Sequence, residues 1–227
     1  LGLAHARSLY YELTIGGDRD GRVKAYRIKM IQDGGAYPNI GCLLPMFTRI
    51  MALGVYDIEK FDFESTSVVT NTSPTGAYRG AGRPEATTPL ERMMDAFAME
   101  IEMDPAAVRR INFIPPDAFP MTTQTGADMD SGEYAKAMDA VIEAADYVGL
   151  RAEQARRRTD PSAKLLGLGW STYVEITNPM SAPEFGSIEI KTDGSAVVLT
   201  GSSSHGQGHH TAFAQLAADI TGIPFDK

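Results

Sequence analysis

The sequence predicts an α+β fold in which β-hairpins and a mixed sheet are segregated from the helices along the chain. Three observations support this fold class. Segments rich in β-favouring residues come first, a block with helical periodicity occupies the middle, and strand-like segments followed by one helix come last. A doubly wound sheet is disfavoured because its strands and helices would alternate along the chain.

The first predicted elements are strands. Residues 8–15 and 22–32 are rich in β-favouring residues and flank a turn-prone segment at 16–21, which predicts a hairpin. Residues 33–50 contain several glycines and prolines among large apolar residues and are typical of a buried irregular loop. Residues 61–70 are rich in Phe, Val and Thr and predict another strand.

Helices follow in the middle of the chain. Apolar residues recur at helical spacing from Leu90, and the pattern stops at Asp104. Asp104 is a favourable N-cap and Pro105 a favourable first residue for a second helix, which runs to about Phe113. A third helix is predicted over residues 132–147, because its apolar side chains again share one face.

The C-terminal part returns to β-structure and then ends in a helix. Strands are predicted at residues 167–177, 184–191 and 195–201. Asp193-Gly194 forms the hairpin turn between the last two of them. The helix is predicted over residues 211–221, with Gly222 as its C-terminal cap.

The chain divides into two domain segments. A polar, arginine-rich stretch at 151–164 separates the central helices from the C-terminal elements. Exposed polar stretches of this kind are typical of domain boundaries. We therefore predict one segment over residues 1–160 and a second over residues 161–227.

The composition limits the function classes. A hydrophobic content of 43% over 227 residues is ordinary for a protein with a packed core. The 21 basic and 29 acidic residues give a net charge of −8, the wrong sign for binding nucleic acid by phosphate neutralisation. The apolar, uncharged run at residues 34–48 is too short to cross a bilayer. No nucleic acid and no membrane are therefore expected as partners.

Cys42 is the only cysteine in the chain. A single cysteine excludes an internal disulfide and cannot by itself hold an iron–sulfur cluster, and a reducing compartment, the cytoplasm, is expected. Its sequence neighbours are apolar and supply no cation that would activate a thiolate. A structural cysteine is therefore favoured over a nucleophile.

The stretch from Gly76 to Ala86 places three glycines and two arginines directly before a helix. Glycines let backbone N–H groups approach a ligand that a Cβ would exclude, a helix N-terminus favours anions, and arginine supplies planar donors for anionic oxygens. The pattern predicts an anion-binding loop with the side chain of Arg79 projecting into a cavity. The alternative is a glycine-rich turn with two solvated arginines.

A second loop of this type, residues 202–211, contains a Gly-Gln-Gly segment at 206–208. It suits a pyrophosphate or a ring carbonyl, because Gln207 offers both a donor and an acceptor. Two such loops indicate one large polyanionic ligand held from two sides. His205 and His209 also have the i, i+4 spacing of a zinc-binding helix, so a zinc hydrolase stays an alternative, although no Glu occupies the general-base position.

Together these motifs resemble the large, molybdenum-binding subunits of the xanthine dehydrogenase, aldehyde oxidase and carbon monoxide dehydrogenase family. The likeness runs along nearly the whole chain. It is carried by Asp33-Gly34-Gly35-Ala36-Tyr37, Ala77-Tyr78-Arg79-Gly80-Ala81-Gly82-Arg83 with Glu85-Ala86, Arg110-Ile111-Asn112-Phe113-Ile114, Asp130-Ser131-Gly132 and Gly206-Gln207-Gly208-His209. The resemblance implies that residues 1–160 are the C-terminal part of a first molybdopterin-binding domain and residues 161–227 the N-terminal part of a second.

The resemblance also implies a cofactor and the groups around it. The expected cofactor is molybdopterin in its cytosine dinucleotide form, with molybdenum. Groups near the metal would be those of Tyr78, Arg79, Gly80 and Ala81, with Arg79 as the catalytic residue. Arg79 and Gly80 would approach the molybdenum, and no side chain would ligate it directly. The pterin or pyrophosphate would contact Gly206, Gln207, Gly208 and His209.

The implied reaction is oxidative hydroxylation of an aldehyde or heterocycle. Electrons would pass to an iron–sulfur small subunit and an FAD-binding medium subunit, which would be the partners. Gly80 stands where carbon monoxide dehydrogenases carry a copper-binding cysteine, which favours the copper-free group. His210 stands where many relatives have Glu, so the local charge near the phosphates would differ.

Family members are several times longer than this chain. Their catalytic glutamate lies beyond the position of Lys227, and another glycine-rich cofactor loop lies before Leu1. We therefore expect the chain to be a fragment that is inactive by itself. A non-catalytic anion-binding or scaffold module, which keeps the loops without the chemistry, is the alternative.

Overall fold

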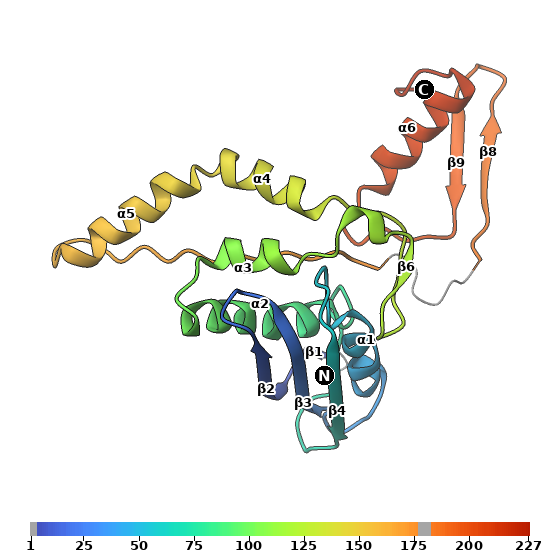
Figure 1. Ribbon diagram of the computed structural model, residues 1–227. Helices are drawn as coiled ribbons and strands as arrows, with labels where there is room; N and C mark the ends of the chain where they lie inside the picture. The colour runs from blue at the N-terminus through green and yellow to red at the C-terminus, as the bar shows by residue number, and fades with distance from the viewer. Residues whose placement is uncertain (1–3, 177–182) are drawn as a thin grey trace. The chain divides into compact units, whose positions relative to one another are not determined.

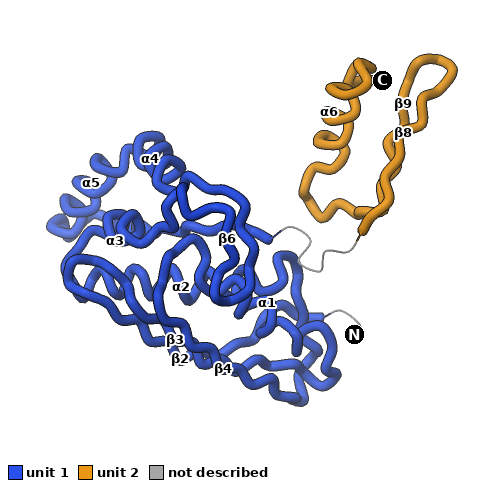
Figure 2. The backbone as a smooth tube through the Cα atoms, turned by 45° about the vertical axis from the view of Figure 1, so that its right-hand side comes forward, with its two compact units in different colours: residues 1–176 blue, residues 177–227 orange. Residues whose placement is uncertain are grey.

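The computed structural model describes residues 4–176 and 183–227 and forms two compact units, unit 1 (residues 1–176) and unit 2 (residues 177–227), coloured blue and orange in Figure 2. Unit 1 contains a three-stranded sheet with helices packed around it. Unit 2 contains a β-hairpin and one helix. These elements confirm the predicted α+β fold class.

The sheet of unit 1 is mixed, as predicted (Figure 1). Its strands, in spatial order, are β2 (Leu9–Gly17), β3 (Val23–Asp33) and β4 (Lys60–Val68). β3 pairs antiparallel with β2, which confirms the hairpin, and parallel with β4. Side chains along β3 alternate between buried and exposed positions, so that Tyr26, Ile28 and Met30 share the face turned to the core.

The connection from β3 to β4 is more regular than the predicted irregular loop at residues 33–50. It contains the 3-10 helix η1 (Ile40–Leu43) and the helix α1 (Leu44–Met51). Pro45 lies in the first turn of α1, where the missing N–H would have no intrahelical partner. A proline that suggests a loop is therefore compatible with a helix start at this position.

The long helix α2 (Arg83–Glu100) packs on the core face of the sheet (Figure 1). Leu90, Met94, Phe97 and Ala98 are its buried apolar residues and join the strand side chains in one core. The helix begins at Arg83, earlier than the predicted start at Leu90. Its first two turns contain two prolines and four polar residues, so apolar periodicity does not reveal them.

Three further helices complete unit 1. They are α3 (Pro105–Asn112), α4 (Tyr134–Ala144) and α5 (Tyr147–Thr159), with a 3-10 turn η2 (Pro116–Ala118) between α3 and α4. The carboxylate of Asp104 accepts from the N–H groups of Ala106 and Ala107, at 2.8 and 3.3 Å, so the predicted cap of α3 is confirmed. α5 occupies much of the stretch predicted as a polar separator, because Glu153 bridges Arg156 and Arg157 along the helix.

Short strands tie distant segments of unit 1 together. β1 (His5–Ala6) pairs parallel with β5 (Thr75–Gly76), and β6 (Met121–Thr122) pairs antiparallel with β7 (Asp128–Met129). The pairing of β1 with β5 sets Arg7 beside the start of the first glycine loop.

The strand predicted at 167–177 does not form over residues 167–176, and residue 177 lies outside the described residues. Thr172 instead donates its N–H to the carboxylate of Glu91 at 3.1 Å. In this segment, hydrogen bonds to the side chain of Glu91 on α2 take the place of backbone hydrogen bonds to a neighbouring strand.

Unit 2 consists of β8 (Gly186–Ile190), β9 (Ala196–Thr200) and α6 (His209–Thr221). β8 and β9 form the predicted antiparallel hairpin around Asp193-Gly194. Gly222 ends α6 in the left-handed conformation and donates its N–H to the carbonyl of Ala218 at 2.9 Å, which confirms the predicted cap. Among the described residues of both units, no helix has the length and apolar character that a bilayer crossing requires.

Candidate functional site

The first glycine loop, residues 77–82, connects β5 to α2. Tyr78 is 88% exposed, and Gly80 and Gly82 adopt φ angles of 67° and 85°, which favour glycine. Within the described part of the chain, neither the N–H of Gly80 nor that of Ala81 donates a hydrogen bond. The loop therefore leaves two adjacent amide donors without an acceptor in the described part of the chain.

The N-terminus of α2 already holds a carboxylate of the protein itself. Glu85 lies in the first turn with its side chain fully buried, and Oε1 is 2.6 Å from Nε of Arg7. Pro84 has no N–H to offer, and the N–H of Arg83 is bonded to the carbonyl of Gly80 at 3.1 Å. This differs from the expectation that the helix end adds to anion binding: at α2 the available donors are those of the loop.

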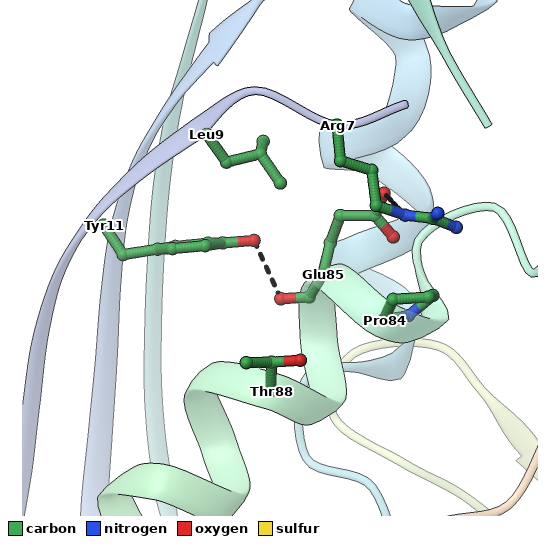
Figure 3. Close-up of a pocket in the computed structure, with 6 residues that line it drawn as sticks. All are labelled: Arg7, Leu9, Tyr11, Pro84, Glu85 and Thr88. Carbon is green, nitrogen blue, oxygen red and sulfur yellow. Dashed lines mark hydrogen bonds and ion pairs between the residues drawn. The ribbon is translucent and has the colours of Figure 1, made fainter. Parts of the chain in front are cut away.

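A cavity of about 260 Å³ adjoins Arg7 and Glu85 and is also lined by Leu9, Tyr11, Pro84 and Thr88 (Figure 3). Oε2 of Glu85 has no hydrogen-bond partner among the described residues. The hydroxyl of Tyr11 donates to the backbone carbonyl of Glu85 at 2.9 Å. Burial, assisted by the charge of Glu85, raises the pKa of Tyr11 above its ordinary value, so this phenol stays a neutral donor at physiological pH.

On its other side the loop meets Glu175. Oε1 of Glu175 lies 3.8 Å from Nε of Arg83, and Oε2 lies 3.5 Å from the position that a Cβ on Gly80 would take. Burial lowers the pKa of Arg83, and the charge of Glu175 opposes that effect. A carboxylate that is 49% exposed thus stands at the corner of the loop, and the sequence alone gave no reason to place it there.

The second glycine loop precedes α6 and has the same backbone character. Gly206 and Gly208 adopt φ angles of 100° and 76°, and Gly208 is the N-cap of α6. Among residues 4–176 and 183–227, no side chain caps this helix, and a Cβ on Gly208 would meet no atom within 4 Å. The start of α6 therefore combines open space with uncapped amides, which suits an anion.

The side chains of the second loop are arranged locally. The amide oxygen of Gln207 accepts from the N–H of His205, so this acceptor is used within the loop. The ring of His209 stacks on Phe213 with a centroid separation of 4.9 Å, and its Nδ1 is buried without a hydrogen-bond partner among the described residues. Residues 4–176 and 183–227 contain no cluster of three His, Cys, Asp or Glu side chains placed to hold a metal ion.

The predicted site residues fall into two groups. Tyr78, Arg79, Gly80 and Ala81 share one loop of unit 1. In unit 2, Gly206, Gln207 and Gly208 share one loop, and His209 follows as the first residue of α6. That the two loops face a common ligand stays a prediction. Arg7, Glu85 and Glu175 contact or border the first loop and are additions from the structure.

Cys42 is half-buried. Its sulfur lies 2.4 Å from the position that a Cβ on Gly34 would take, so the glycine makes room for the thiol. This packing agrees with a structural role.

Family models for a molybdopterin cofactor-binding domain match residues 2–113 and residues 140–227. The first match contains the first glycine loop, and the second contains the other loop. The chain is 36% identical over 236 residues to the carbon monoxide dehydrogenase large chain of Hydrogenophaga pseudoflava. The alignment covers 97% of this chain and 29% of the relative. It is 32% identical over 241 residues to the nicotine 6-hydroxylase large subunit of Paenarthrobacter nicotinovorans. That alignment covers 99% of this chain and 29% of the relative.

The fold is also that of a solved relative. Quinoline 2-oxidoreductase from Pseudomonas putida 86 aligns with a TM-score of 0.88 and 33% identity over 100% of this chain and 30% of that one. The chain thus spans less than a third of the length of these relatives. It belongs to the family of molybdenum-binding large subunits that includes xanthine dehydrogenase, aldehyde oxidase and carbon monoxide dehydrogenase.

Proposed function

We propose that the native gene product containing this chain is a molybdenum hydroxylase that oxidatively hydroxylates an aldehyde or an aromatic heterocycle. The observation that carries the proposal is the pair of glycine loops with unused backbone donors, each inside a segment matched by a molybdopterin-binding model. A relative named for a nicotine hydroxylase and one named for a quinoline oxidoreductase favour heterocyclic substrates.

The residues present fit a molybdopterin dinucleotide. The uncapped start of α6, with open space at Gly208, suits its pyrophosphate. The amides of Gly80 and Ala81 and the guanidinium of Arg79 would hold the end of the cofactor that carries the metal. Gly206, Gln207 and His209 would contact the pterin or the pyrophosphate.

When bound, the cofactor supplies the oxygen transfer and accepts the electrons of the substrate. The chain's own residues would position these events. Backbone donors at Gly80 and Ala81 are fixed in space before the reaction and so stabilise negative charge without reorganisation. Arg79 would add a cation on the same loop. The carboxylate of Glu175 would place a negative charge at the corner of the loop near Gly80.

The finer assignments are also proposals. The cofactor would be the cytosine dinucleotide form, and the partners would be an iron–sulfur small subunit and an FAD-binding medium subunit in the cytoplasm. Large subunits of multi-subunit enzymes among the relatives support the partners. The segments 1–160 and 161–227 would be parts of two successive molybdopterin-binding domains.

The test is to purify the native gene product from a host that makes the cofactor. Molybdenum and pterin content, and dye reduction driven by aldehydes or N-heterocycles, would be measured. Arg79→Ala is expected to lower turnover by about 100-fold, because it removes a donor from the site of developing charge. Arg92→Ala, at an exposed position on α2, is the matched control and is expected to leave turnover unchanged.

A gene product without molybdenum, or an Arg79→Ala variant as active as Arg92→Ala, would contradict the proposal. The alternative of a non-catalytic anion-binding module predicts the first of these results, and the relatives, which are named for enzymes, give it no support. Stoichiometric zinc in place of molybdenum would instead favour the hydrolase alternative.

A further inference from the structure

We propose that Arg7 and Glu85 form a clamp that fixes the direction of two peptide groups in the first glycine loop, and so aims the N–H groups of Gly80 and Ala81. The purpose of the clamp rests on the proposed function. The clamp itself rests on contacts within unit 1. Neither residue belongs to a glycine loop, and both act on the site through the backbone of other residues.

The contacts form a chain from a buried carboxylate to the loop, and Figure 3 shows the first of them, between Glu85 and Arg7. Nε of Arg7 lies 2.6 Å from Oε1 of Glu85, whose side chain is fully buried. Nη2 of Arg7 lies 2.6 Å from the carbonyl oxygen of Arg79 and 3.4 Å from that of Gly80. Because the guanidinium is a rigid planar fork, the bond to Glu85 orients the donor that meets the two carbonyls.

The direction of each carbonyl group also sets the direction of the N–H in the same planar peptide group. In a trans peptide the C=O and the N–H point in opposite directions. The carbonyl of Arg79 belongs to the same peptide group as the N–H of Gly80, and the carbonyl of Gly80 belongs with the N–H of Ala81. Since Arg7 draws both carbonyls toward itself, both N–H groups are directed away from it, and both are unused within the described chain.

The backbone at Arg7 supports a specific role for this side chain. Arg7 follows β1, whose parallel pairing with β5 sets it beside the loop. Its φ of 27° is a left-handed conformation that a non-glycine residue rarely adopts and that persists only where the surroundings over-determine it. The ion pair with Glu85 can hold Arg7 in this conformation, because the buried carboxylate of Glu85 would be strongly destabilising without its cation.

The test compares variants of the native gene product, prepared with the cofactor and from a host that lacks molybdopterin synthesis. Arg7→Ala removes the clamp. Arg7→Lys keeps the charge but cannot offer the planar fork. Arg22→Ala is the matched control, since Arg22 also pairs with one carboxylate, that of Asp57, and donates to one carbonyl, that of Ile111 at 3.2 Å.

The first readout needs no cofactor. Trypsin cleaves after the exposed Arg79, so the rate of cleavage at the Arg79–Gly80 bond reports the order of the loop. In the cofactor-free protein, Arg7→Ala is expected to raise this rate about tenfold and Arg7→Lys nearly as much, while Arg22→Ala leaves it unchanged. The second readout is turnover per bound molybdenum, with kcat and KM separated. Arg7→Ala is expected to lower kcat at least about tenfold and to change KM by less than twofold. The reason is that N–H groups pointing elsewhere no longer stabilise the negative charge that develops in the transition state.

Each outcome decides something. Unchanged cleavage in Arg7→Ala would overturn the clamp whatever the protein binds. Faster cleavage with kcat per molybdenum equal to that of Arg22→Ala would overturn its role in the site, and so would full rescue by Arg7→Lys. Faster cleavage in Arg7→Ala, together with a wild-type gene product that carries no molybdenum, would support the clamp and refute the proposed function instead.

Discussion

Glu91 of α2 lies 2.9 Å from Arg109 of α3, measured from Oε2 to Nε, with 6% and 0% of the two side chains exposed. Arg109 also donates to Asp95 at 2.7 Å and to the backbone carbonyl of Glu91 at 3.0 Å. The same carboxylate accepts from the hydroxyl of Tyr56 at 2.7 Å and from the N–H of Thr172 at 3.1 Å. One ion pair therefore joins two helices to the segment that carries Glu175.

Removing one partner of this pair should be costly. Arg109→Met is expected to lower the free energy of unfolding by about 3–5 kcal/mol, because the carboxylate of Glu91 stays buried without its cation. Denaturant unfolding would measure the change. Arg110→Met is the control: Arg110 is 41% exposed in its pair with Asp139, so a loss below about 1 kcal/mol is expected. Equal losses in the two variants would contradict the prediction.

The two glycine N-caps should differ in their tolerance of alanine. A Cβ on Gly82 would lie 2.5 Å from Cβ of Phe47, whereas a Cβ on Gly208 would meet none of the described atoms within 4 Å. Both have positive φ, which costs alanine about 1–2 kcal/mol. Gly82→Ala should therefore destabilise by about 1–3 kcal/mol more than Gly208→Ala, because overpacking adds to the backbone term. Thermal unfolding of both variants would test this, and similar losses would refute it.

Asp33 should make stability depend on pH. The N–H of Gly35 and the hydroxyl of Thr70 donate to its carboxylate and hold the pKa of Asp33 below the ordinary value of 3.8. A lowered folded-state pKa stabilises the fold above 3.8, and this contribution is lost as pH falls through the lower folded value. Asp33→Asn should therefore unfold at a lower temperature than wild type at pH 7, and the difference should vanish toward acid. Asp62→Asn, at an exposed position on β4, is expected to show a small difference without this trend.

The elements that the sequence predicts correctly have local signals. Asp104 marks the start of α3, Asp193-Gly194 the turn between β8 and β9, and Gly222 the end of α6, because cap and turn chemistry belongs to the residue itself. The first turns of α1 and α2 each contain a proline, and α2 also has Glu85, but neither helix start has a side-chain cap within the described chain. Pro45 and the polar residues from Arg83 onward suit helix starts only in a context that the sequence does not display.

The candidate site divides in the same way. The glycines at 80, 82, 206 and 208 could be identified from the sequence. Their residue type itself marks the positions, and each has the positive φ that favours glycine. Arg7 and Glu175 could not be identified in this way, because only tertiary contacts bring them to the loop. The pairing of β1 with β5 positions Arg7, and the hydrogen bonds of Thr172 to α2 position the segment that carries Glu175. Glu85 alone offered a signal, as an acidic residue at the start of a helix.

The pairing of His5 with Thr75 has a consequence for biosynthesis. These partners are 70 positions apart (75 − 5), so β1 cannot close against β5 until the intervening chain has been translated. At about 5–20 residues per second, that delay is roughly 4–14 seconds. Arg7 is synthesised before the carbonyl groups that it binds in the folded chain, so the contacts between Arg7 and the first glycine loop form only after residue 80 has been translated.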